Sequence, residues 1–193
     1  MKMNSFFFTK ILIKRYLYTF ILFVICCSME AQVVNVSGNW TANIPAITEA
    51  GNNYSGTYDN STNTAPNQIV LSGSIPDSVI KLLSSSGAKI TMRYVSNPWH
   101  SSLGLSAKRV GGTASISGLC LGCTVSINGG TTYIPISPAT DVTLSTITFS
   151  GLLGVGNHIT YSGIVVNTQV SGVSVTIPAS TYSARIVFTI VAN

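Results

Sequence analysis

Cys120 and Cys123 are the residue pair with the clearest chemistry, because cysteines at this spacing can form a disulfide, bind a metal or exchange disulfides. In an extended strand the two Cα atoms would lie roughly 10 Å apart, whereas a disulfide needs them within about 7 Å. A β-turn brings them that close, and Gly122 suits the positive φ of a type II turn.

We therefore expect a disulfide across a turn, with free thiols as the main alternative. A redox site would need a helix starting at the first cysteine, but the following Thr-Val-Ser-Ile is typical of a strand. A zinc site would need two more ligands, and the sequence has no second Cys-x-x-Cys and no paired histidines. We expect no metal and no cofactor.

A second group of candidate residues is Arg93, Tyr94, Trp99 and His100, the densest cluster of large side chains with polar ends. Aromatic rings can stack on sugars, and Arg and His can donate hydrogen bonds to hydroxyls. The cluster is thus a candidate carbohydrate-contact patch. The alternative is that Trp99 closes one end of a hydrophobic core while His100 lies on the surface.

Acid–base catalysis and nucleic-acid binding have few residues to work with. Charged residues make up 8% of the 193, against roughly 25% in an average soluble protein. There are five Asp and Glu and two His, and no Gly-x-Ser-x-Gly motif. Nucleic-acid binding would need a basic patch. We expect that the protein is not an enzyme and has no nucleic-acid partner.

Residues 1–31 are typical of a secretory signal peptide. The first fifteen residues carry four Lys and Arg and no acid, and a nearly unbroken apolar run follows over 16–29. That run is shorter than the roughly 20 residues of a membrane-spanning helix. Cleavage after Ala31 would leave residues 32–193, with no membrane partner. A retained membrane anchor and a lipoprotein are the alternatives.

Residues 32–193 show the period-2 alternation of β-strands and no convincing helical period. The pattern predicts one antiparallel β-sandwich domain, immunoglobulin-like or jelly-roll-like, with about ten strands. Asn128-Gly129 predicts a hairpin turn, and the alternation changes phase between Leu144 and Ile147 and again at Ser171-Gly172, as a bulge or tight turn would cause. Besides the two terminal strands, we expect strands near 67–75, 89–96, 102–110, 114–120, 123–128, 131–137, 142–150, 158–170 and 172–178.

The terminal strands, 34–44 and 182–192, alternate most regularly, and Arg185 is the only charge in either. Terminal strands can lie at sheet edges, and an exposed edge can pair with a strand of another chain. We expect at least one of them to be an edge strand. The alternative is that both pair with interior neighbours and close the sandwich. The candidate assembly residues are Val34, Val36, Trp40, Ile186, Phe188 and Ile190.

Three further features of the sequence are a polar stretch and two kinds of candidate modification site. Residues 45–66 are polar and predict a long loop, either a solvated surface loop or a binding loop. Asp77-Ser78-Val79 is similar to the O-glycosylation acceptor pattern of Bacteroidetes, which makes Ser78 a candidate modification site; the alternative is a turn capped by Asp77. Asn-x-Ser/Thr sequences occur at Asn35, Asn39, Asn53 and Asn60.

A low-charge β-rich chain that follows a signal peptide resembles bacterial fimbrial and surface-appendage subunits. The last strand, Thr181-Tyr182-Ser183-Ala184-Arg185-Ile186-Val187-Phe188-Thr189-Ile190, is similar to their terminal strands, and 97–103 resembles exported Bacteroidetes-type proteins. The resemblance implies a structural or adhesive protein at the cell surface or in the periplasm of a Gram-negative bacterium. Its expected partners are itself or other surface subunits; the alternative is glycan binding around Trp99, and an exported enzyme is the third reading.

Overall fold

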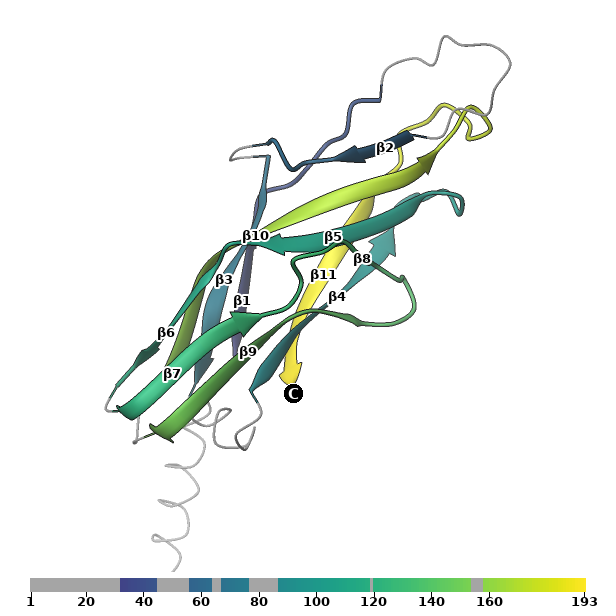
Figure 1. Cartoon of the computed structure of the whole chain (residues 1–193). Coiled ribbons are helices and arrows are strands. Elements are labelled where there is room, and N and C mark those ends of the chain that lie inside the picture. The colour runs from purple at the N-terminus through teal and green to yellow at the C-terminus, as the bar shows by residue number, and fades with distance from the viewer. Residues whose placement is uncertain (1–31, 45–55, 64–66, 77–86, 119, 154–157) are drawn as a thin grey trace, which may run out of the picture. The chain divides into compact units, whose positions relative to one another are not determined.

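The computed structural model describes residues 32–44, 56–63, 67–76, 87–118, 120–153 and 158–193 (Figure 1). Residues 32–193 form one compact unit, built from two antiparallel sheets, which confirms the predicted antiparallel β-sandwich. No helix that could cross a membrane occurs in the described ranges. The strands found there are β1 (Val33–Ser37), β2 (Gly56–Asp59), β3 (Ile69–Pro76), β4 (Ala88–Ser96), β5 (Gly104–Val110), β6 (Thr113–Ser117), β7 (Cys120–Asn128), β8 (Ile134–Pro135), β9 (Val142–Leu153), β10 (His158–Val173) and β11 (Ala184–Ala192).

The first sheet is organised around β10, which is 16 residues long and pairs with two strands on each side. Along one side β10 pairs with β3 and then with β2; along the other it pairs with β6 and then with β5. Strand β1 lies beyond β3, and β8 lies beyond β5. Strands 158–170 and 172–178 were expected to be separate, but β10 runs through to Val173, and residues 174–183 form no strand.

The expectation of a loop over 45–66 was wrong at one point, because β2 lies within it and pairs with β10. Asn60, which follows β2, forms hydrogen bonds with Thr168 of β10. Thr168 lies between the part of β10 that pairs with β3 and the part that pairs with β2. The Asn60 N–H donates to the carbonyl of Thr168 at 3.2 Å, and the Asn60 side-chain oxygen accepts the Thr168 N–H at 2.7 Å. Asn60 is fully buried, so its Asn-x-Ser/Thr sequence is not accessible for glycosylation in the folded protein.

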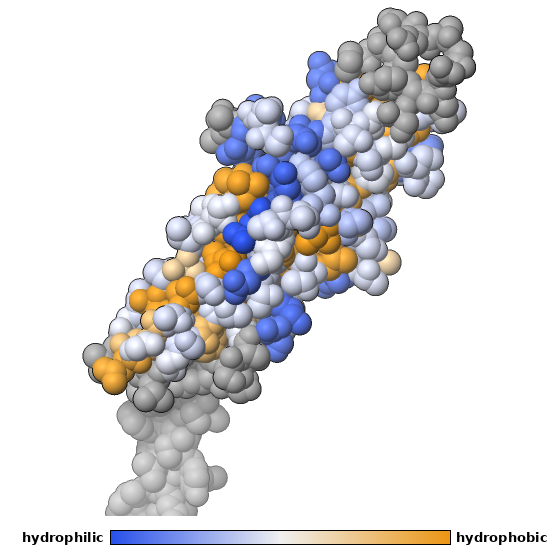
Figure 2. Space-filling view, viewed as in Figure 1, coloured by the Kyte–Doolittle hydropathy of each residue, from blue (hydrophilic) through white to orange (hydrophobic). Residues whose placement is uncertain are grey.

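The second sheet has the order β11-β4-β9-β7, and its inner face packs against the first sheet. The fully buried side chains at this interface include Leu71, Ile90, Met92, Leu144, Ile147, Ile159, Ile164 and Val166. Most of their neighbours along the strands are more exposed, because successive side chains point to opposite faces of a sheet; Thr91, Ser145 and Asn167 are buried polar exceptions. The surface is correspondingly poor in charge, and Figure 2 shows separate hydrophobic groups among weakly hydrophilic ones.

Bulges explain the phase changes that the sequence shows. Leu144 is an extra residue in β9 opposite the Ile90–Thr91 step of β4, and the pairing of β10 with β2 shifts between Val170 and Val173. These positions match the phase changes predicted between Leu144 and Ile147 and at Ser171-Gly172. A bulge inserts one residue into a strand, so it moves the following side chains to the other face.

The expected hairpin at Asn128-Gly129 was wrong, because the strands that it joins belong to different sheets. Strand β7 pairs with β9, whereas β8 pairs with β5. Arg109 of β5 holds this connection. Its backbone N–H donates to Gly130 O, and its side chain donates to Gly129 O at 3.0 Å and also to Gly111 O. These contacts with β5 direct the chain across to the first sheet.

Candidate functional site

A groove lies between the two sheets, at the edge where the two terminal strands of the sandwich are found. Strand β1 ends one sheet and β11 ends the other, so both are edge strands among the described strands. Gln32 connects the two edges, because its side-chain Nε2 donates to the carbonyl of Ile190 at 3.0 Å. The expectation that at least one terminal strand lies at a sheet edge is therefore confirmed.

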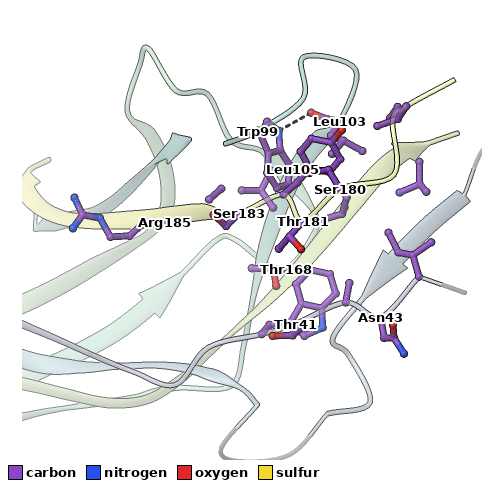
Figure 3. Close-up of a pocket in the computed structure, with 18 of the residues that line it drawn as sticks. Thr41, Asn43, Trp99, Leu103, Leu105, Thr168, Ser180, Thr181, Ser183 and Arg185 are labelled. Carbon is purple, nitrogen blue, oxygen red and sulfur yellow. Dashed lines mark hydrogen bonds between the residues drawn. The ribbon is translucent and has the colours of Figure 1, made fainter. Parts of the chain in front are cut away.

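The groove has a volume of about 1270 Å³ and walls from both sheets (Figure 3). Ile69, Leu105 and Val170 belong to the first sheet, and Ile186 and Phe188 to β11. Among the described lining residues Arg185 alone is charged, and in Figure 3 its side chain points away from the other labelled residues. The lining consists of Val36, 38–44, Ile69, Trp99, Leu103, Leu105, Thr168, Val170, 173–186 and Phe188.

The backbone of β11 beside the groove has hydrogen-bonding groups that face the free edge. Odd-numbered residues of this segment bond toward β4: Ser183 N donates to Pro98 O at 2.8 Å, and Asn193 N donates to Gly87 O at 3.1 Å. The register with β4 is regular from Ala184 to Ala192, so the even-numbered residues point their N–H and C=O groups outward. The bond from Gln32 to Ile190 O follows this rule.

Ala184, Ile186 and Phe188 therefore present backbone donors and acceptors that no described residue pairs with. Their side chains are partly buried and line the groove. This combination of an unpaired edge and an apolar wall can bind an extended polypeptide. A strand placed along β11 could pair with the backbone and insert every second side chain into the groove.

The candidate assembly residues converge on this region. Val36 is 50% exposed and lines the groove together with Trp40, Ile186 and Phe188. Val34 is partly buried against the core and Ile190 is buried. The expected strand 34–44 was too long, because β1 ends at Ser37 and 38–44 pair with no described strand.

The candidate carbohydrate residues are only partly brought together. The rings of Tyr94 and Trp99 lie 5.9 Å apart between centroids, and the indole N–H of Trp99 donates to Leu103 O at 3.0 Å. His100 lies beside Tyr182, 6.0 Å between ring centroids, a partner that the sequence analysis did not include. Arg93 lies on the opposite face of β4 from Tyr94, because successive side chains of a strand point to opposite faces. It forms an ion pair with Asp141, in which Arg93 Nε lies 3.7 Å from Asp141 Oδ1.

Cys120 and Cys123 lie at disulfide distance, with Cα atoms 5.8 Å apart. Gly122 between them has a φ of +66°, the left-handed conformation expected for it. The predicted turn between two strands was wrong, since the pair occupies a bulge within β7. Gly151 on β9 accommodates the bulge, because a Cβ there would lie 2.7 Å from Cys123 Cα.

A polar cluster on the first sheet, away from the groove, contains Asp59, Lys108 and Tyr133. Lys108 Nζ lies 4.5 Å from the centroid of the Tyr133 ring. Burial raises the pKa of Tyr133, with a further contribution from the charge of Asp59. Hydrogen bonds from the Ser61 side chain and backbone lower the pKa of Asp59. Within the described residues, no three His, Cys, Asp or Glu side chains are grouped so that they could hold a metal ion.

The candidate modification site Ser78 lies outside the described residues. Comparison with known proteins gives no match to a protein-family model, a curated protein or a solved structure.

Proposed function

We propose that this protein is an exported structural or adhesive subunit of the bacterial surface, which associates by accepting a strand into the groove beside β11. The partner is a second copy of the chain or another surface subunit. The observation that carries the proposal is the outward-facing backbone of Ala184, Ile186 and Phe188, directly next to a groove into whose wall their side chains project. Such an edge is a template for strand addition.

The size of the groove supports an extended partner. Protein interiors are packed about as densely as organic crystals, with few voids larger than a water molecule. An opening of about 1270 Å³ between the sheets leaves Ile186 and Phe188 only partly buried. An inserted strand would complete the core and remove this apolar surface from water. Among the described lining residues only Arg185 is charged, which favours an uncharged partner.

The protection that edge strands usually have is also missing. Monomeric proteins place Lys, Pro or inward-pointing charges on exposed edges, which prevents pairing with other chains. Strand β1 has no charge, and β11 has Arg185 alone. The signal-like residues 1–31 and the cysteines at disulfide distance are consistent with export to an oxidising compartment, the cell surface or the periplasm.

Val36→Lys tests the proposal. Val36 is 50% exposed, so the monomer should tolerate the substitution, but a charge in the groove should prevent strand insertion. The matched control is Val110→Lys, at a position that is 44% exposed and does not line the groove. In sedimentation velocity over a range of concentrations, Val36→Lys should stay monomeric while Val110→Lys associates like the wild type. A wild type that is monomeric at every concentration would refute the proposal.

Carbohydrate binding is the second candidate function. The same groove presents Trp40, Trp99 and Tyr182 beside neutral hydroxyl and amide groups, which suits an uncharged sugar. Because the Trp99 N–H is already bonded to Leu103 O, this residue would contribute its ring face. Saturable glycan binding that Trp99→Ala abolishes, with monomeric wild-type protein, would favour this function over strand addition.

A further inference from the structure

Residues 38–44 are a strand-like segment without a strand partner. Their alternation continues the pattern of β1, with Trp40, Ala42 and Ile44 on one side and polar residues between them. Gly38 has a φ of +83°, a conformation that glycine adopts without strain and that ends the pairing with β3. After this bend the segment forms one wall of the groove, and Figure 3 shows Thr41 and Asn43 on it.

The segment contributes side chains to the groove but no hydrogen-bonded strand. Its backbone makes no hydrogen bond to another described residue. Trp40 and Ala42 are partly buried, whereas Asn39, Thr41 and Asn43 are exposed and Ile44 is 39% exposed. Segments with few hydrogen bonds to the rest of a fold open at low free-energy cost.

We propose that residues 38–44 are a displaceable cover of the groove, and Trp40 is its largest partly buried side chain. The cover shields the apolar wall of the free subunit and leaves when a partner strand pairs with β11. This inference rests on the proposed function: the cover regulates the addition of a partner strand at β11. The cover slows association, since an incoming strand must first displace Trp40. The cover does not pair with β11, so the outward-facing groups of Ile186 and Phe188 stay available to the incoming strand.

Trp40→Ala tests the cover in two independent measurements. Binding of the apolar dye anilinonaphthalene sulfonate to the monomer should increase severalfold, because the groove wall becomes accessible. The association rate should rise by about tenfold, as expected for loss of a large aromatic anchor. Leu121→Ala is the matched control, since Leu121 is 81% exposed and lies outside the groove; both measurements should match the wild type.

A synthetic peptide of residues 38–44 provides a second test that does not depend on the stability of the variant. Added to Trp40→Ala protein, it should suppress dye binding in a saturable manner, whereas the same peptide with alanine in place of Trp40 should not. Unchanged dye binding in Trp40→Ala, or association slower than in the wild type, would overturn the cover. If the wild type never associates, strand addition is wrong, and dye binding alone then decides whether 38–44 shield the groove.

Discussion

Asn60→Ala should destabilise the protein by about 2 kcal/mol, because Asn60 takes the place of a strand partner for Thr168. Val166 of β10 pairs with Ile69 of β3, and Gln169 pairs with Asp59 of β2, so Thr168 lies where neither strand reaches. Alanine keeps the backbone bond to Thr168 O but removes the side-chain oxygen that accepts the Thr168 N–H at 2.7 Å. A buried N–H without a partner costs roughly 1–3 kcal/mol.

Two terms act on this value in opposite directions. Loss of the buried side chain leaves a small cavity, which adds to the cost. The Asn60 Nδ2 group has no partner in the folded protein, and its removal relieves part of the cost. In a domain of this size about 2 kcal/mol corresponds to a fall in Tm of roughly 4–8 °C.

Thermal and urea unfolding followed by circular dichroism measure the effect. The matched control is Asn128→Ala, whose amide bonds Ser126 and Thr148 on the exposed surface and should change stability by less than about 0.5 kcal/mol. Asn60→Asp keeps an oxygen that can accept the Thr168 N–H but places a carboxyl group at a fully buried position, so it should also destabilise the protein. An Asn60→Ala protein as stable as Asn128→Ala would refute the role of Asn60.

Three further predictions concern other contacts. Mass spectrometry of the purified native protein should show two hydrogens fewer than in the reduced chain, as expected for a Cys120–Cys123 bridge; quantitative labelling of both thiols in the native protein would contradict it. Tyr161→Phe removes the hydroxyl that donates to Val33 O at 2.9 Å and should cost about 1 kcal/mol in urea unfolding; an unchanged unfolding midpoint would show that this bond does not hold β1. Ser61→Ala should raise the lowered pKa of Asp59 toward its ordinary value, measured by carboxyl NMR titration, and an unaltered titration would exclude the Ser61 hydroxyl as a cause.

The strands that could be predicted from the sequence are those with one apolar and one polar face. Strands β3, β4, β9 and β11 lie within a few residues of their predicted bounds, because burial of one face imposes period-2 alternation. The bulge at Leu144 was visible as a phase change for the same reason. The short distance between Cys120 and Cys123 depends on local backbone geometry alone. The prediction that they lie close together was therefore right, although the predicted turn is a bulge in the structure.

Features that depend on distant partners could not be predicted. Strand β2 has four residues and is recognised by its pairing with β10, more than a hundred positions away in the sequence. Asn60 lies in a polar stretch and carries no local sign of burial. The regular alternation to Ile44 suggested one long strand, but the sheet edge ends at Ser37 and leaves 38–44 beside the groove. The groove itself depends on how both sheets pack, which no single segment encodes.

Residue-resolved hydrogen exchange of the β11 amides, before and after association, tests the central claim most directly. The amides of Arg185 and Val187 point toward β4 and should be protected in both states. Those of Ile186 and Phe188 point to the free edge, so they should exchange rapidly in the monomer and become protected when a strand is added. Association that leaves the amides of Ile186 and Phe188 unprotected would contradict strand addition at β11.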